Sequence, residues 1–214
     1  FLATTELQKV PYTIVSRCQV FNFKKPTDVI LKDMILETAK KEGFKMDTSS
    51  AELISILGDG SYRDTLGALQ KVLNFSESKN IKREDIENIT GAPKTTLVND
   101  FISAIAEKDL ESGIATVRNA SKENLDMKLF AKLIIQKFRM AIILKYAPKL
   151  EAEMSANLSP EDITFLKELS KKDKEGMMRS PSLSILLEAY QNIDKSFVSE
   201  LPLELALIKI LAKE

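Results

Sequence analysis

The chain has 214 residues, 44% of them hydrophobic and 29% charged, a composition that suits a globular protein with a real core. Lysine plus arginine and aspartate plus glutamate both number 31, so the formal net charge is zero, which excludes a broad basic surface for nucleic acid. With no histidine and one cysteine, Cys18, the chain cannot form a His/Cys metal site, a Ser-His-Asp triad or an internal disulfide framework.

The first 23 residues have the composition of β-strands. We expect one short strand at residues 1–5 and a second at 19–23. The run T-I-V-S-R-C-Q-V-F at 13–21 is typical of a buried strand, with Arg17 in its middle. A guanidinium is expensive to bury without an anion. Arg17 therefore either has an anionic partner or reaches solvent with its stem along apolar surface.

Helical patterns begin after Pro26 and fill the range 24–91. Hydrophobic periodicity, capping residues and closing glycines predict four helices, at about 27–42, 49–58, 61–75 and 82–89. The second and third of them start at the capping patterns Ser49-x-x-Glu52 and Ser61-x-x-Asp64. These helices predict a compact all-helical unit, and Gly91-Ala92-Pro93 is the best candidate for a linker to the rest of the chain.

Longer helices are expected between residues 94 and 214. Apolar stripes predict helices at about 95–107, 109–119 and 125–146, and three further helix starts are predicted at Ser159-Pro160, Ser180-Pro181 and Pro202. We interpret Lys171-Lys172-Asp173-Lys174 as a solvated connection. The whole range predicts a second, larger helical bundle.

A second arginine stands out in the sequence G-D-G-S-Y-R-D at residues 58–64. Arg63 falls in the first turn of its helix, where the helix dipole and the unsatisfied N–H groups make a positive end. A cation is mildly unfavourable there, unless an anion such as phosphate is bound by Arg63 and the backbone together. The alternative is a solvated arginine paired with Asp59 or Asp64.

Two strings, LATTELQKVPYTIVSRCQVFNFKKP and GDGSYRDTLGALQKVL, resemble the bacterial clamp-loader ATPases of the AAA+ class, in particular the gamma/tau subunits of DNA polymerase III. The resemblance has specific motifs up to about residue 90 and is weaker beyond. It implies a mainly α fold in three parts. These are a short β remnant of an incomplete AAA+ nucleotide-binding core at 1–23, a small helical lid domain at 24–91 and a helical-bundle collar domain for oligomerisation at 94–214.

The resemblance also implies roles for four residues at the nucleotide. Thr5 in A-T-T-E matches sensor 1, a hydroxyl that reads the γ-phosphate of ATP, with Thr4 as the alternative. Arg17 in S-R-C matches the arginine finger that faces the ATP of the neighbouring subunit, so its anion lies outside this chain. Arg63 matches sensor 2, the lid arginine that reaches the γ-phosphate in its own subunit. The implied cofactors are ATP and Mg²⁺ in the complete protein, with no metal site in this chain.

The chain departs from that family in the parts that hold the phosphates. It has no G-x-x-x-x-G-K-[ST] loop, no acidic cluster for Mg²⁺ after an apolar strand and no cysteine zinc module. We therefore expect an N-terminally incomplete chain that alone binds ATP weakly or not at all and hydrolyses none. Two alternatives stay open: a non-catalytic helical scaffold like the delta-prime subunit, and a related AAA+ ATPase of DNA repair or recombination.

The function that the resemblance implies is that of a motor in the DNA polymerase III holoenzyme, which uses ATP to load the sliding clamp onto primed DNA during replication. The implied partners are the other clamp-loader subunits, in a ring of five joined through the collar, the sliding clamp, and primer–template DNA held by the assembled complex. The single cysteine fits a reducing cytoplasm. No apolar run approaches the roughly 20 residues that span a bilayer, so no membrane partner is expected.

Overall fold

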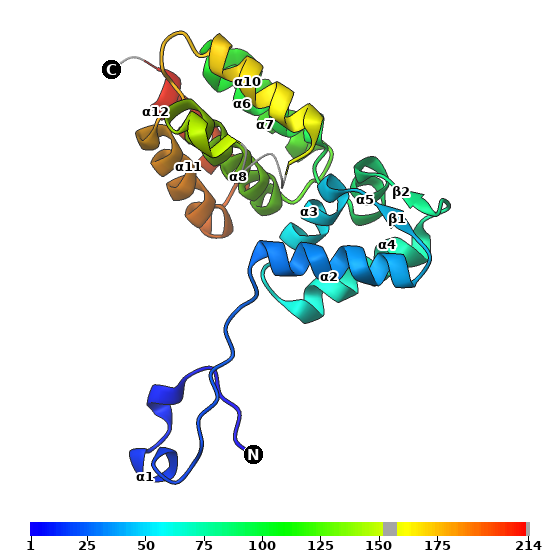
Figure 1. Ribbon diagram of the computed structural model, residues 1–214. Coiled ribbons are helices and arrows are strands. Elements are labelled where there is room, and N and C mark those ends of the chain that lie inside the picture. The colour runs from blue at the N-terminus through cyan, green and yellow to red at the C-terminus, as the bar shows by residue number, and fades with distance from the viewer. Residues whose placement is uncertain (152–157, 213–214) are drawn as a thin grey trace.

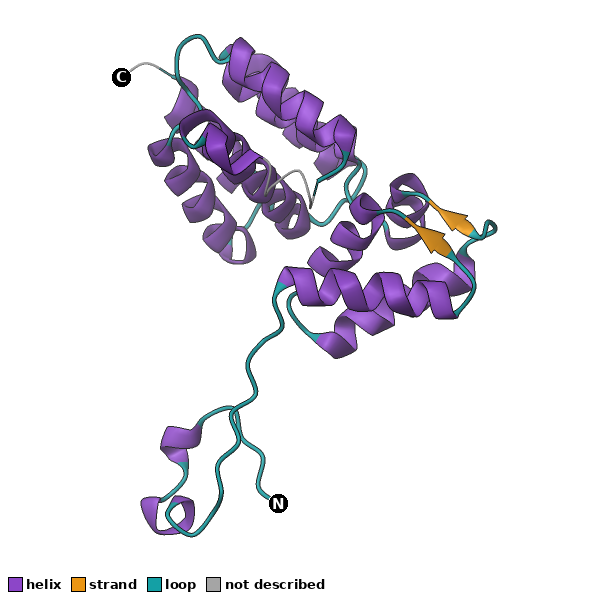
Figure 2. Cartoon of the chain, viewed as in Figure 1, coloured by secondary structure: helices purple, strands orange, loops and turns teal. Residues whose placement is uncertain are grey.

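Two helical units and an N-terminal arm make up the chain in a computed structural model that describes residues 1–151 and 158–212. We call residues 1–27 the arm, helices α2–α5 the four-helix unit and helices α6–α12 the C-terminal bundle. Figure 1 shows the arm extending away from the two units, which are in contact with each other. Helices dominate both units (Figure 2), so the predicted mainly α fold is confirmed. Among the described residues, none of the helices has the length and hydrophobicity of a membrane span.

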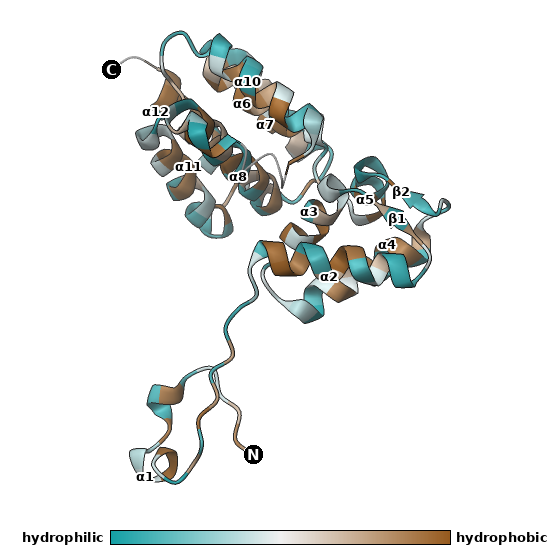
Figure 3. Cartoon of the chain, viewed as in Figure 1, coloured by the Kyte–Doolittle hydropathy of each residue, from teal (hydrophilic) through white to brown (hydrophobic). Residues whose placement is uncertain are grey.

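The arm has two short turns of helix, a 3₁₀ turn at Leu7–Lys9 and the α-helical turn α1 (Tyr12–Val15). The strands predicted at 1–5 and 19–23 are therefore wrong, and so is the buried strand at 13–21. Most side chains of the arm are exposed, hydrophobic ones included. Figure 3 shows hydrophobic and hydrophilic residues interspersed along the arm. A strand needs a neighbour for its backbone groups, and in the described chain no other segment pairs with the arm. A β-like composition without a partner strand does not form a sheet.

Four helices and one pair of very short strands form the four-helix unit. They are α2 (Asp28–Lys41), β1 (Lys45–Met46), α3 (Thr48–Leu57), α4 (Tyr62–Phe75), β2 (Asn80–Ile81) and α5 (Arg83–Thr90). Ser61 caps α4 as predicted and accepts the N–H of Asp64 at 3.3 Å. Helix α3 starts at Thr48, because Asp47 and not Ser49 is its capping residue.

The two strands decide where two helices begin. β1 and β2 pair in parallel, with Lys45 opposite Asn80 and Met46 opposite Ile81. Figure 2 shows the pair at the edge of the unit. Each strand is followed within two residues by a helix, so the pairing places the first turns of α3 and α5 next to each other. Two residues are too few to show the alternation of a strand, and the sequence did not predict this pair.

The C-terminal bundle is arranged around its longest helix. Its described helices are α6 (Thr95–Glu107), α7 (Leu110–Lys122), α8 (Met127–Tyr146), α10 (Pro160–Lys172), α11 (Ser180–Asn192) and α12 (Leu201–Leu211), with 3₁₀ turns at Pro148–Leu150 and Ile193–Lys195. Helix α8 packs against α6, α10 and α11. Phe130 of α8 and Phe101 of α6 are both fully buried and meet edge to face, with ring centroids 6.0 Å apart.

The connection between α10 and α11 is organised by a buried carboxylate, that of Asp173. The carboxylate of Asp173 is fully buried and forms an ion pair with Lys145 of α8 at 2.5 Å. It also accepts the N–H groups of Met177 and Met178, at 2.6 and 3.1 Å. The interpretation of residues 171–174 as a solvated connection is therefore wrong for Asp173. Its lysine neighbours made the segment resemble a surface loop.

The predicted linker joins the two units, but it is not a flexible tether. Gly91 ends α5 with a φ of 73°, a left-handed conformation that glycine adopts without strain. Ala92 and Pro93 after it are buried. One hydrophobic core continues across this point and includes Ile86 of α5 and Val98 of α6. The two units thus share a core.

Candidate functional site

The site residues that the sequence predicts lie in two separate places. Thr4, Thr5 and Arg17 are exposed on the arm, and Arg63 is exposed on α4 of the four-helix unit. Because the arm extends away from that unit (Figure 1), the structure does not bring them together. Thr4 Oγ1 accepts the N–H of Glu6 at 3.0 Å, a local turn bond that leaves its hydroxyl hydrogen free to donate.

Arg17 follows the single helical turn of the arm. Its backbone N–H donates to the carbonyl of Ile14 at 3.1 Å and closes that turn. Its guanidinium has no ion pair or hydrogen bond with any residue of the ranges 1–151 and 158–212. An exposed arginine with all its donors free agrees both with a solvated side chain and with a partner outside this chain.

The turn between α3 and α4 places Arg63 at the start of its helix. Asp59 and Gly60 both have a left-handed backbone, with φ of 48° and 77°, and this reverses the chain direction. Ser61 then caps α4, so that Arg63 is the second residue of the helix. The N–H groups of this first turn have no acceptor within the helix. The site therefore combines a guanidinium with the positive end of a helix dipole.

Asp59 is not the partner of Arg63. Its carboxylate accepts a hydrogen bond from Lys132 of α8 at 2.5 Å. This bond and the charge of Lys132 hold the pKa of Asp59 below its usual value. Asp64 uses its N–H in the cap of α4, and no acidic side chain of the described residues pairs with Arg63. The alternative of an arginine paired with Asp59 or Asp64 is therefore not found in this structure.

Gly58 is required by the close approach of α3 and α4. A Cβ at this position would lie 1.9 Å from Oγ1 of Thr65 and 2.7 Å from its Cα, a backbone atom that cannot rotate away. We predict that Gly58→Ala lowers the free energy of unfolding by about 1–3 kcal/mol, as overpacking does in tight cores.

Gly67→Ala is the matched control, because a Cβ on Gly67 of α4 meets nothing within 4 Å. This variant should be neutral or stabilising by up to about 1 kcal/mol, since alanine is the better helix former. Urea unfolding followed by circular dichroism measures both variants. Equal stabilities would contradict the requirement for glycine at position 58.

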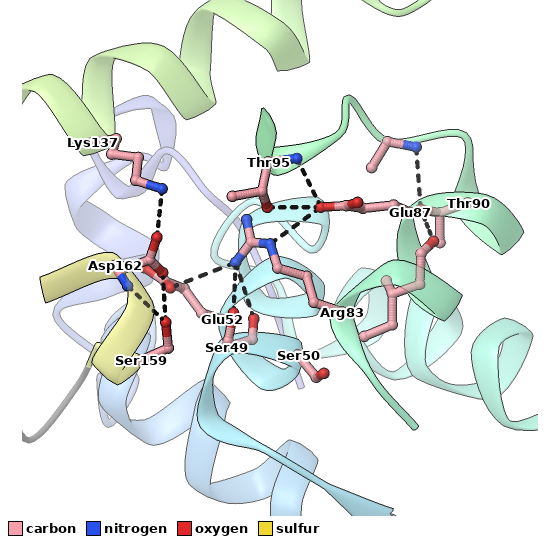
Figure 4. Close-up of polar contacts among 12 residues, drawn as sticks. Ser49, Ser50, Glu52, Arg83, Glu87, Thr90, Thr95, Lys137, Ser159 and Asp162 are labelled. Carbon is pink, nitrogen blue, oxygen red and sulfur yellow. Dashed lines mark hydrogen bonds and ion pairs between the residues drawn. The ribbon is translucent and has the colours of Figure 1, made fainter. Parts of the chain in front are cut away.

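A cluster of polar side chains lies where α3, α5, α6, α8 and α10 come together (Figure 4). Its centre is Arg83, in the first turn of α5. The Nη1 of Arg83 donates to the carbonyl and the hydroxyl of Ser49 on α3, at 3.2 and 3.1 Å. Its Nε donates to Glu87 one turn further along, at 3.3 Å. Glu52 of α3 lies 3.9 Å from the same guanidinium. Arg83 thus fixes the first turns of α3 and α5 to each other.

Glu87 extends this cluster from the four-helix unit to the C-terminal bundle. Its Oε1 accepts both the N–H and the hydroxyl of Thr95, the first residue of α6, at 3.0 and 2.8 Å. Glu87 is buried, and a buried carboxylate is costly unless donors surround it. Arg83 and Thr95 supply those donors from opposite sides of the linker. The contact therefore joins α5 to α6 in addition to the covalent connection.

A buried ion pair completes the cluster from the side of the bundle. Lys137 of α8 donates to Asp162 of α10, whose N–H donates to its capping residue Ser159 at 3.1 Å. Burial lowers the pKa of Lys137, and the charge of Asp162 opposes this shift. Burial also raises the pKa of Glu52, against the opposing charge of Arg83. Both shifts have the sign expected of groups that are withdrawn from water.

The first turns of α3, α5, α6 and α10 all face one polar cleft of about 730 Å³. Positive helix ends that converge in this way favour negative side chains, and Glu87 and Asp162 supply them. Within the part of the chain that the structure describes, no group of three His, Cys, Asp or Glu residues could hold a metal ion. The hydroxyls of Thr95 and Ser159 donate to the carboxylates of Glu87 and Asp162, and these carboxylates also accept from Arg83 and Lys137, so the groups of the cluster hold one another in place. It is a structural junction.

The sequence did not predict this junction. Arg83 and Glu87 are spaced four residues apart, which is also the spacing of an ordinary exposed ion pair on a helix. Their contacts with Ser49 and Thr95 depend on the strand pairing and on the packed linker. The one local signal is the acidic residue Glu87 in the last turn of α5, where the helix dipole disfavours negative charge.

A family model and two relatives of similar sequence match the chain. A family model described as DNA polymerase III subunits gamma and tau domain III matches residues 81–214. The chain is 35% identical over 130 residues to the DNA polymerase III subunit gamma/tau of Mycoplasma pneumoniae, covering 61% of this chain and 19% of the relative. It is 29% identical over 209 residues to the tau subunit of Bacillus subtilis, covering 98% of this chain and 36% of the relative.

Among solved structures, the clamp loader delta protein of Bacillus subtilis is similar with a TM-score of 0.47 and 18% identity, covering 89% of this chain and 58% of that one. The chain spans about a fifth of the length of the first relative and about a third of the second. The family match includes part of the four-helix unit and extends over the whole C-terminal bundle. Because that match covers more than half of the chain, the chain belongs to the family of DNA polymerase III gamma and tau subunits.

Proposed function

We propose that this chain is the lid and collar of an ATP-driven clamp-loader subunit, in which Arg63 senses bound ATP. The observation that carries the proposal is the position of Arg63. It is an exposed guanidinium without an acidic partner in the described residues, in the first turn of α4. The free N–H groups and the dipole of that turn favour an anion, so side chain and backbone can bind a phosphate together. Membership of the gamma/tau family supports ATP as the source of that phosphate.

In the complete protein the four-helix unit is the lid over ATP and Mg²⁺, which bind to the core that precedes it. Arg63 contacts the γ-phosphate in its own subunit, and Thr5, or Thr4 as the alternative, contacts the same phosphate as sensor 1. Arg17 reaches the ATP of the neighbouring subunit and neutralises charge on the phosphoryl group as it is transferred. When the γ-phosphate is lost, Arg63 loses its anion, and the lid is free to change its position.

The C-terminal bundle is the collar in this proposal. It joins the subunit to the other clamp-loader subunits in a cytoplasmic ring of five, which opens the sliding clamp and holds primer–template DNA. Exposed leucines on α11 and α12, among them Leu187, Leu201 and Leu205, support a contact surface for neighbouring subunits. The zero net charge supports DNA binding by the assembled ring instead of by this chain alone.

Arg63→Ala in the complete subunit tests the proposal. We expect ATP to bind about 10- to 100-fold more weakly, because hydrogen bonds to charged groups contribute about 1.5–3 kcal/mol. ATP-dependent loading of the clamp onto primed DNA should fall with it. Titration with a fluorescent ATP analogue measures binding, and retention of labelled clamp on circular primed DNA measures loading.

Lys71→Ala is the matched control, because Lys71 is an exposed cation further along the same helix. It should leave both measurements unchanged. If the two variants behave alike, Arg63 is not a nucleotide sensor. A non-catalytic helical scaffold subunit is then the better description of the chain.

A further inference from the structure

One lysine of the C-terminal bundle reaches the turn that places Arg63. The Nζ of Lys132 on α8 donates to the carbonyl of Ile56, in the last turn of α3, at 3.0 Å. It also donates to Oδ1 of Asp59 at 2.5 Å. We call these two contacts the Lys132 bridge. A cation at this position is favourable, because the last carbonyls of α3 form the negative end of its dipole.

The bridge holds a short segment whose shape sets the start of α4. Asp59 has a left-handed backbone, which residues other than glycine adopt at some cost. Its side chain is held by Lys132, and its N–H donates to the same Ile56 carbonyl at 3.3 Å. Only three residues separate Asp59 from Arg63. A displacement of α8 relative to the four-helix unit therefore acts on the turn from which Arg63 projects.

The bridge and the packed linker, with its contact between Glu87 and Thr95, join the two units at different places. The linker lies between α5 and α6, whereas the bridge joins α8 to the turn between α3 and α4. A contact at a point away from the linker opposes rotation of one unit relative to the other about the linker.

We propose that Lys132 is a positioning residue that couples the C-terminal bundle to Arg63. While both contacts of the Lys132 bridge are formed, the four-helix unit and the bundle move as one body. Binding of an anion at Arg63 therefore acts on α8 through the bridge and not through the linker. This inference rests on the proposed function for the nature of the anion, but the bridge itself is a feature of the chain alone.

The strength of the bridge fits a positioning role better than a stabilising one. The Asp59 side chain is 81% exposed, and exposed ion pairs contribute little to stability. Lys132 is 26% exposed, because its stem lies against the protein. Loss of the bridge should thus leave folding nearly intact and act on the relative orientation of the units.

Distance measurements in the 214-residue chain test whether loss of the bridge changes the relative orientation of the two units. Spin labels are placed at Gln70→Cys on α4 and Gln191→Cys on α11, both exposed positions, after Cys18→Ser removes the native thiol. Lys132→Met removes the donors and keeps the stem, and Lys132→Arg keeps the charge. The matched control is Lys128→Met, one turn earlier on α8. The side chain of Lys128 is 27% exposed and forms an ion pair at 2.5 Å with Asp194, which belongs to the same bundle.

We expect a narrow distribution of label-to-label distances in the spin-labelled chain with Lys132 and Lys128 unchanged, and the same distribution for Lys128→Met and Lys132→Arg. For Lys132→Met we expect a broadened or shifted distribution. Thermal unfolding midpoints should fall by similar small amounts in the two methionine variants. In the complete subunit, Lys132→Met should retain ATP affinity and lose clamp loading several-fold. A distribution for Lys132→Met identical to that of Lys128→Met overturns the inference, whatever Arg63→Ala does. A changed distribution together with an inert Arg63→Ala supports the bridge and refutes the proposed function instead.

Discussion

Arg17→Ala in the complete subunit is expected to slow ATP hydrolysis at the neighbouring subunit by about 10³- to 10⁵-fold, the range of arginine fingers supplied from another chain. The subunit that carries the change should still bind its own ATP. The physical reason is the position of Arg17 on the arm, where it is exposed and has no anionic partner in the described residues. A guanidinium in that state can enter the pocket of a neighbour without first breaking an ion pair.

Mixed assemblies decide where the arginine acts. Subunits with Arg17→Ala are combined with subunits that lack the phosphate-binding loop, and hydrolysis should persist only at interfaces where an intact arginine meets an intact pocket. Lys9→Ala serves as the control, because Lys9 is an exposed cation of the same arm that is paired with Glu6 at 2.8 Å. A fall in the stability of the isolated chain, with normal hydrolysis in the assembly, would show that Arg17 has a structural role.

Asp173→Ala is expected to destabilise the chain by about 3–5 kcal/mol, the loss typical of breaking a buried ion pair. Lys145 can still reach water, since its side chain is 22% exposed, but the N–H groups of Met177 and Met178 lose their acceptor. Met178 is 1% exposed, so water does not easily replace the carboxylate there. Urea unfolding followed by circular dichroism measures the loss.

The control for this change is Glu188→Ala. Glu188 pairs with Lys209 at 3.3 Å, and both side chains are more than half exposed. Pairs of this kind contribute about 0–1 kcal/mol, so the unfolding midpoint should hardly move. If Asp173→Ala proved as mild as Glu188→Ala, the turn after α10 would not depend on its carboxylate.

The helices were the most predictable part of the fold, because their signals are local. Helix α6 occupies Thr95–Glu107, the range that its apolar stripe predicts, and Ser61 caps α4 as its sequence pattern indicates. The prediction of strands in the arm was wrong for the opposite reason. A strand is stable only beside another strand, and the run around Arg17 has no such neighbour in the described chain.

The contacts of the buried polar side chains were not predicted, for a related reason. Asp173 was interpreted as solvated because lysines surround it in the sequence, but its burial depends on Lys145, which is 28 residues away. In the same way, Ser49 is 34 residues from Arg83, and no spacing rule connects them. Arg63 could be recognised from the sequence because the unusual feature, a cation in the first turn of a helix, is local. Its phosphate partner, like that of Arg17, remains a prediction from sequence.

The buried linker has a consequence for how this protein can be divided. Residues 91–94 look like a domain boundary, yet Ala92 and Pro93 are buried there and the core runs through from Ile86 to Val98. A truncated version that starts at α6 would cut through the core that includes Ile86 and Val98, and would leave the N–H of Thr95 without its acceptor Glu87. The natural unit for expression, for recombination between relatives and for cooperative unfolding is thus the whole of α2–α12, and the arm, whose side chains are mostly exposed, can be separated from it.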